Sequence, residues 1–181
     1  MRIDIGSVLR ISANLPYADL VTRSTGAAVR KCIERELEGM GEGDVATLDF
    51  THIGMMDYSC ADEVVAKLLL DLARVGARPA YVVFHGITDA HLEAIENVLF
   101  HHGLALVVYF ADGGARLVGS VSDDERLIWE LVQGRGTIAA DELASASDRR
   151  SDELIGILET LLTRRLLRRD GLAYAPLPGV N

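Results

Sequence analysis

Cysteine is scarce in this sequence, and long hydrophobic runs are missing. The 181 residues include two cysteines, Cys32 and Cys60. Both stand in segments expected to form or precede a helix, where a free buried thiol is the ordinary state. Apolar runs stay far below the roughly 20 residues that cross a bilayer, and no early run resembles a secretory signal. We therefore expect a cytoplasmic protein without a membrane partner.

Positive charge is also in short supply. Lysine and arginine number 18 against 27 acidic residues, which gives a formal net charge of -9. Nucleic acids and anionic membranes repel a chain of this sign, so any DNA contact requires a local basic patch. Apolar residues, in contrast, make up 49% of the chain, enough for packed cores.

Motifs for catalysis and for cofactors are absent. Ser59 lacks the flanking glycines of a Gly-x-Ser-x-Gly nucleophile elbow. The sequence contains no Gly-x-x-x-x-Gly-Lys phosphate loop, no Cys-x-x-Cys pair and no His-x-x-x-His pair. We therefore predict a protein that is not an enzyme, binds no metal and needs no cofactor.

Strand and helix patterns alternate through the first two thirds of the chain. The stretch "RIDIGSVLRISANL" predicts an extended pair that turns at Gly6 and Ser7. Strands are then predicted at "DVATLDF", "PAYVVF", "LALVVYF" and "ARLVGSV", and the helices between them end at Gly39, Gly76 and Gly103. This order predicts an α/β domain over residues 1–120, with helices covering one sheet.

A family resemblance rests on the middle of this domain. The segments "VLRISANL", "ATLDFTHIGMMDYSCADEVVAKLL" and "RPAYVVF" together resemble a STAS domain, the fold of bacterial anti-sigma factor antagonists, over residues 5–112. In that family the turn after the "LDF" strand reads Asp-Ser-Ser-Gly, and its second serine accepts a phosphate from a histidine-kinase-like ATPase. Asp57 falls on the motif aspartate and Ser59 on the phospho-acceptor, with Tyr58 and Cys60 in place of the first serine and the glycine.

Ser59 has three interpretations from the residues around it. As a helix cap it accepts the N–H of Asp62, with Asp62 as its capping-box partner. As part of a recognition turn it helps to dock a partner. As a phospho-acceptor it gains from the adjacent helix N-terminus, but Asp57, Asp62 and Glu63 crowd the same turn and repel an added phosphate.

The start of the preceding helix, "LVTRSTGAAVR", is the second unusual piece. Gly26 and the alanines that follow it let another backbone approach closely, which indicates either packing on the sheet or a docking surface. We predict a surface for a protein partner beside the turn, made of Arg23, Thr25, Asp57, Tyr58, Ser59, Asp62 and Glu63.

The last third of the chain has a different pattern. Three helices are predicted at 123–133, 139–146 and 150–166, followed by a hairpin that turns at Asp170 and Gly171. The stretch "TIAADELASASDRRSDELIGILETLLTRRLLRRDGLAY" resembles the bacterial winged helix-turn-helix regulators, which implies a second domain over residues 122–178. In those regulators the early exposed residues of the third helix enter the major groove; here they are Ser151, Asp152, Glu153, Ile155 and Gly156.

The charge of this second domain bears on whether it binds a protein or DNA. Residues 122–181 contain eight arginines and no lysine against eleven acids, a net of -3, whereas DNA-reading domains are basic. The possible DNA contacts are Arg149, Arg150, Arg168 and Arg169. We expect a bacterial regulatory or adaptor protein that docks a protein partner in signal transduction. The alternative is a transcription regulator that binds DNA through the winged helix and senses a signal through the STAS-like domain.

Overall fold

The computed structural model describes residues 1–13, 18–74, 80–110 and 112–179. Two compact units divide the chain: the first holds Met1–Ser120 together with Gly179, and the second holds Val121–Pro178. The predicted helix end at Gly76 lies outside the described residues. Within the described ranges, no helix combines the length and the apolar character needed to cross a membrane.

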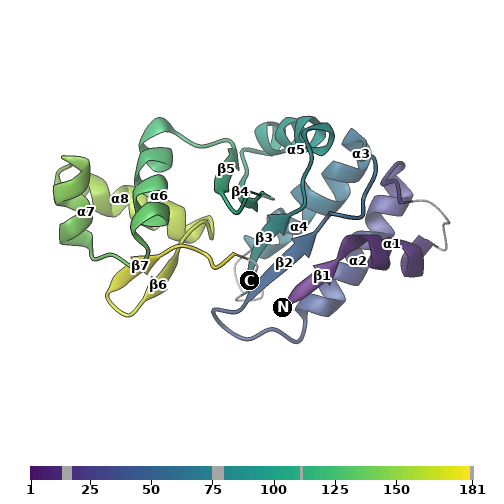
Figure 1. Cartoon of the computed structure of the whole chain (residues 1–181), viewed down its shortest axis with the longest axis horizontal. Coiled ribbons are helices and arrows are strands. Elements are labelled where there is room, and N and C mark those ends of the chain that lie inside the picture. The colour runs from purple at the N-terminus through teal and green to yellow at the C-terminus, as the bar shows by residue number, and fades with distance from the viewer. Residues whose placement is uncertain (14–17, 75–79, 111, 180–181) are drawn as a thin grey trace. The chain divides into compact units, whose positions relative to one another are not determined.

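The first unit is an α/β structure built on a five-stranded sheet of order β1-β2-β3-β4-β5 (Figure 1). Strands β1 to β4 run parallel, and β5 is antiparallel to β4. The strands are Arg2–Asp4, Val45–Asp49, Tyr81–His85, Ala105–Tyr109 and Ala115–Gly119. Right-handed crossovers between sequential parallel strands place the connecting helices on one face of the sheet.

The core of the first unit lies between that face and the helices. Alternate residues of the strands, such as Leu48, Phe84 and Val108, belong to one buried cluster with helix residues such as Ile33 and Val64. The rings of Phe50 and Phe84 stack in this cluster with centroids 5.4 Å apart. Strand β2 pairs with β1 on one edge and with β3 on the other, so the turn that follows it starts from a fixed point.

The N-terminal segment differs from the prediction. Only Arg2–Asp4 is a strand, and helix α1 occupies Ile5–Ala13 where a second strand was expected. The side chain of Asp4 causes the change, because it accepts hydrogen bonds from the N–H groups of Gly6 (2.9 Å) and Ser7 (3.3 Å) and so caps a helix start. Ile5 and Leu9, one helical turn apart, are both fully buried.

The other helices of the first unit follow the predicted pattern. They are α2 (Arg23–Leu37), α3 (Tyr58–Ala61), η1 (Asp62–Ala66), α4 (Lys67–Leu72) and α5 (Asp89–His102). Gly103 ends α5 in the left-handed conformation, with φ at 65°, which glycine adopts without a steric cost. The sequence predicted one regular helix after the turn, but its second segment, η1, is a π-helix.

The second unit has three helices and a hairpin in the predicted order. Helices α6 (Asp123–Arg135), α7 (Ala140–Ser147) and α8 (Ser151–Thr163) pack against one another. Strands β6 (Arg168–Asp170) and β7 (Ala173–Ala175) form an antiparallel pair, and Ile138 adds a bridge to Tyr174 on the other side of β7. Trp129 is buried among these elements and donates its Nε1–H to the Leu166 carbonyl at 3.1 Å.

Candidate functional site

Residues 55–60, here called the Ser59 turn, end the loop that follows β2 and form the start of α3, and they lie beside the start of α2. A short parallel bridge joins Leu20 to Met56. The Leu20 N–H donates to the Met55 carbonyl at 2.8 Å, and the Asp57 N–H donates to the Leu20 carbonyl at 3.0 Å. Because α2 and α3 both begin just after this bridge, Arg23 and Tyr58 are brought to neighbouring positions from segments 35 residues apart.

Asp57, and not Ser59, caps α3. Its Oδ1 accepts the Cys60 N–H at 2.8 Å and the Ser59 hydroxyl at 2.8 Å, while Oδ2 accepts the Thr22 N–H at 3.3 Å. The interpretation of Ser59 as the cap is therefore wrong. The Ser59 hydroxyl donates a hydrogen bond to Asp57. Asp57 in turn accepts N–H groups from Thr22, just before α2, and from Cys60 in α3, and so links the starts of the two helices.

Thr22 has a strained backbone at this same junction. Its φ is 103°, a value that a β-branched residue rarely adopts. Three contacts hold it there: its N–H bonds Asp57, its carbonyl accepts the Cys60 thiol at 2.9 Å, and its hydroxyl lies 2.9 Å from that of Thr25. Such strain persists only where the surroundings enforce it, and it clusters at functional sites.

Arg23 extends from this junction over two buried acids. Its Nη1 donates to Asp62 Oδ2 at 2.7 Å and to Glu63 Oε1 at 3.1 Å. The carboxylate side chains are 12% and 5% exposed, whereas that of Arg23 is 54% exposed. This corrects the prediction that Asp62 and Glu63 themselves form the surface: they lie beneath it and orient the exposed arginine.

Lys67 and His102 add further contacts to this acidic pair. Lys67 pairs with Glu63, and its Nζ lies 3.9 Å from Asp62 Oδ2. His102 Nε2, from the last turn of α5, lies 2.9 Å from Asp62 Oδ1. Both acids stand at the start of the π-helical segment η1, and π-turns inside helices occur frequently at functional sites.

The electrostatics of the cluster keep its carboxylates ionised. Burial raises the pKa of Asp62 and Glu63, but hydrogen bonds from Arg23, His102 and Lys67 outweigh burial and leave both pKa values below their ordinary range. The pKa of Asp57 is likewise lowered, because the Cys60 N–H and the Ser59 hydroxyl outweigh the effect of burial. A negative charge therefore stays 2.8 Å from the Ser59 oxygen, which opposes an added phosphate at that position.

Gly26 allows α2 to approach α3 closely. A Cβ atom at this position would stand 3.0 Å from Glu63 Cβ and 3.1 Å from Cys60 Cα, closer than side chains tolerate without movement. Gly26 is buried, whereas Ala27 and Ala28 are only partly buried. Gly26 therefore allows close packing, but against α3 and η1 and not on the sheet as predicted.

The outer surface of the site carries one cation and two large apolar side chains. Tyr58 is 46% exposed and Met55 is 61% exposed, on either side of Asp57. Thr25 is partly exposed; its N–H donates to the Thr22 hydroxyl oxygen at 3.3 Å, and the two hydroxyl oxygens lie 2.9 Å apart. Sequence reasoning missed Met55 and His102: the first has no motif, and the second contacts Asp62 from 40 residues away.

Cys60 lies beneath this surface, and its thiol is expected to be unreactive. Burial, followed by the charge of Asp57, raises the pKa of its thiol to about 12, so the nucleophilic thiolate is scarce at neutral pH. Within the described part of the chain, no group of three or more histidine, cysteine and acidic side chains is placed to hold a metal ion.

The four arginines predicted as DNA contacts each have a partner inside the second unit. Arg149 forms an ion pair with Asp124, and Arg150 bonds Glu153 at 2.6 Å. Arg168 donates to the Pro176 carbonyl at 3.3 Å, and Arg169 lies over the ring of Tyr174 at 4.9 Å. No cluster of unengaged cations results from these four.

The predicted outer residues of α8 are all exposed: Ser151, Asp152, Glu153, Ile155 and Gly156. Ile155 is 47% exposed, and a Cβ atom at Gly156 would meet no atom within 4 Å. This face therefore combines acids with an apolar centre.

Comparison with known proteins adds no relatives. The chain matches no protein-family model, and it shows no significant similarity to a curated protein.

Proposed function

We propose that this chain is a non-enzymatic regulatory or adaptor protein, and that its first unit docks a protein partner through the Ser59 turn and the start of α2. The docking surface consists of Arg23, Thr25, Met55, Asp57, Tyr58 and Ser59. Asp62 and Glu63 support this surface from below.

The observation that supports the proposal most strongly is that Arg23 is exposed and yet held in a fixed position. Its guanidinium is 54% exposed, yet it is fixed by two carboxylates that are nearly buried. An exposed arginine held in one place loses less entropy when it binds, and preorganised side chains give more affinity for this reason. Tyrosine and arginine are also the residue types that most often dominate protein interfaces, and here they start adjacent helices.

The kind of partner follows from the resemblance to STAS domains. On that basis we propose a regulatory protein, with a histidine-kinase-like ATPase as the first candidate. Control through Ser59 phosphorylation is the finer part of this hypothesis. Ser59 modified in any growth state, as detected by mass spectrometry of protein from the native host, would support it; an unmodified Ser59 in every state would remove it and leave docking without a switch.

A photo-cross-linking experiment tests the docking surface. Benzoylphenylalanine replaces Tyr58 in host cells, and a matched substitution at Leu172, which is 93% exposed in the second unit, serves as the control. We expect a discrete adduct with one protein from position 58 and none of that mass from position 172. Equal labelling of the same protein from both positions, or no adduct from position 58, contradicts docking at the Ser59 turn.

For the second unit we propose a winged-helix structure that docks protein. Three packed helices followed by a hairpin, with the Ile138 bridge beside it, support the winged-helix part. The internal engagement of Arg149, Arg150 and Arg168 and the acids on α8 favour protein over DNA.

Salt dependence separates the two functions of the second unit. True phosphate contacts give affinity that falls steeply as salt rises. We expect no salt-sensitive binding to genomic DNA fragments at low ionic strength, measured by fluorescence anisotropy. A steep salt dependence that disappears in an Arg168→Ala/Arg169→Ala variant would establish the DNA-binding alternative.

A further inference from the structure

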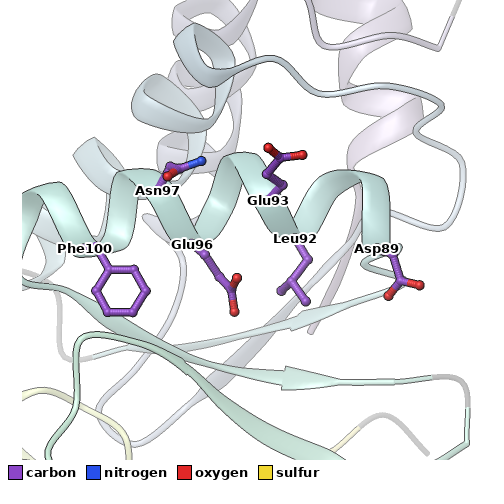
Figure 2. Close-up of a pocket in the computed structure, with 6 residues that line it drawn as sticks. All are labelled: Asp89, Leu92, Glu93, Glu96, Asn97 and Phe100. Carbon is purple, nitrogen blue, oxygen red and sulfur yellow. The ribbon is translucent and has the colours of Figure 1, made fainter.

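Helix α5 carries a second, outward-facing stripe that the proposed docking surface does not use. Six residues line a hollow of about 400 Å³ on this helix. They recur at intervals of three and four positions, which places them on one face of an α-helix. These residues, here called the α5 stripe, are Asp89, Leu92, Glu93, Glu96, Asn97 and Phe100 (Figure 2).

The α5 stripe is distinct from the face with which α5 meets its own core. His91, Ile95, Val98 and Leu99 are the buried residues of the helix, and they hold it against the sheet and the loop before the Ser59 turn. The stripe therefore has no part in the folding of the helix onto the first unit, apart from a partial contact of Leu92 with the core.

Phe100 and Leu92 form the apolar part of the stripe. Phe100 is 63% exposed, an unusual position for a phenylalanine. Leu92 lies two helical turns away, and Figure 2 shows both side chains directed to the same side of α5, with Glu96 between them. Burying such a ring against a partner removes apolar surface from water and favours association.

Three acids surround these apolar side chains. Asp89, Glu93 and Glu96 show no ion pair or hydrogen bond through their side chains to any part of the chain that the structure describes. This contrasts with Asp62 and Glu63, which are neutralised by several cations. Unpaired acids around an exposed aromatic ring repel nucleic acid and anionic lipid and attract a basic partner.

The shape of the hollow favours a partner helix over a small ligand. Every described residue that lines it belongs to α5, and the hollow is a groove largely open to solvent. Small ligands are usually enclosed over most of their surface, which this groove does not provide. The stripe from Asp89 to Phe100 extends roughly 17 Å at 1.5 Å per residue, the length of about three turns of a partner helix.

We propose that the α5 stripe binds a basic amphipathic helix of a partner protein. The apolar face of that helix covers Phe100 and Leu92, and its lysines or arginines pair with Asp89, Glu93 and Glu96. This is the mode in which helices bind in grooves, read as anchors three and four positions apart. The proposal does not depend on docking at the Ser59 turn.

A fluorescently labelled model peptide tests it on the full chain. The peptide is about 18 residues of leucine and lysine, with leucines spaced to form one face of a helix, and its control has glutamate in place of every lysine. We expect the lysine peptide to bind with salt-sensitive affinity and the glutamate peptide not to bind. Nuclear magnetic resonance shifts on peptide addition are expected at α5 first.

Matched variants locate the binding. Phe100→Ala is expected to weaken lysine-peptide binding about tenfold, as the loss of an aromatic anchor does, whereas Ile155→Ala, at another exposed apolar side chain, leaves it within about twofold. The double variant Glu93→Gln/Glu96→Gln is expected to weaken binding several-fold and to reduce its salt dependence. Glu36→Gln on exposed α2 controls for the general negative charge of the protein.

Three outcomes overturn the proposal. One is equal loss on Glu36→Gln and Glu93→Gln/Glu96→Gln, which indicates nonspecific attraction to an acidic protein. Another is unchanged binding in Phe100→Ala. The third is concentration-dependent self-association in sedimentation velocity that Phe100→Ala abolishes, since the occupant is then a second copy of this chain.

Discussion

Two exposed arginines, one in each unit, are held in different ways. Arg23 of the first unit rests on Asp62 and Glu63, whose side chains are 12% and 5% exposed. Arg150 of the second unit pairs with Asp152 and Glu153, whose side chains are 72% and 45% exposed. Exposed ion pairs contribute little to stability, because water and salt screen them. A buried carboxylate is shielded from water, so it holds its arginine more firmly.

This difference suggests which surface is prepared for a specific partner. A cation anchored from below presents one geometry, so a partner can be matched to it. A cation in an exposed pair is held only weakly, because water and salt screen the pair. We therefore expect perturbations of the buried charges to affect the first unit more than the second.

Acidification is expected to have the largest effect. Among the described residues, five carboxylates of the first unit have lowered pKa values, and in the second unit the pKa of Glu125 is lowered. A lowered folded-state pKa means that the unfolded state binds protons more readily. The stability from these groups is therefore complete above their ordinary pKa of about 4 and is lost as the pH falls through the folded values.

The first unit should consequently unfold at a higher pH than the second. The chain has one tryptophan, Trp129, which is buried in the second unit, so its fluorescence follows that unit alone. Amide exchange in β2 follows the first. If Trp129 becomes exposed at a higher pH than the one at which the β2 amides begin to exchange, the second unit unfolds first and the expectation is contradicted.

A substitution at Gly26, where α2 crosses α3, is expected to have the next largest effect on stability. Gly26→Val inserts a branched side chain where even a Cβ would stand 3.0 Å from Glu63 Cβ, and overpacking of this kind costs about 3 kcal/mol. The matched change Gly156→Val meets open space on α8 and should alter the free energy of unfolding by less than about 0.5 kcal/mol. Denaturant titrations followed by circular dichroism measure both; similar effects would show that the crossing at Gly26 is not tight.

Smaller effects are expected at the Ser59 turn. Asp57→Ala removes the cap of α3 and should cost about 1 to 2 kcal/mol. Ser59→Ala removes one partly exposed hydrogen bond and should cost about 0.5 kcal/mol. Ser145→Ala in α7, where the hydroxyl bonds the Asp141 carbonyl at 2.9 Å, is the control and should be nearly neutral. If Ser59→Ala costs as much as Asp57→Ala, the assignment of the cap is incorrect.

Much of the fold was predictable from local pattern. The strand at "DVATLDF" and the helix from Thr88 to Gly103 follow from apolar spacing and from residues that end helices. The first helix was missed because Ile3 and Ile5 alternate like a strand, while the capping by Asp4 that decides for a helix is set by side-chain geometry.

The site was predictable in position but not in detail. The turn contains two residues that can cap a helix, Asp57 and Ser59, and spacing alone does not say which one reaches the free N–H groups. Asp62 contacts His102 of α5, and the start of α2 is joined to the Ser59 turn by the bridge between Leu20 and Met56. These contacts join distant segments, so no local pattern encodes them.

The central claim is that Arg23, fixed over Asp62 and Glu63, anchors a protein partner. The most direct test is the dissociation constant of the partner captured from position 58, measured with purified Arg23→Ala and with Lys31→Ala, an exposed cation two turns along the same helix. We predict at least about a tenfold loss of affinity for Arg23→Ala and a change within about twofold for Lys31→Ala. Equal effects of the two substitutions, or unchanged affinity in Arg23→Ala, would contradict the claim.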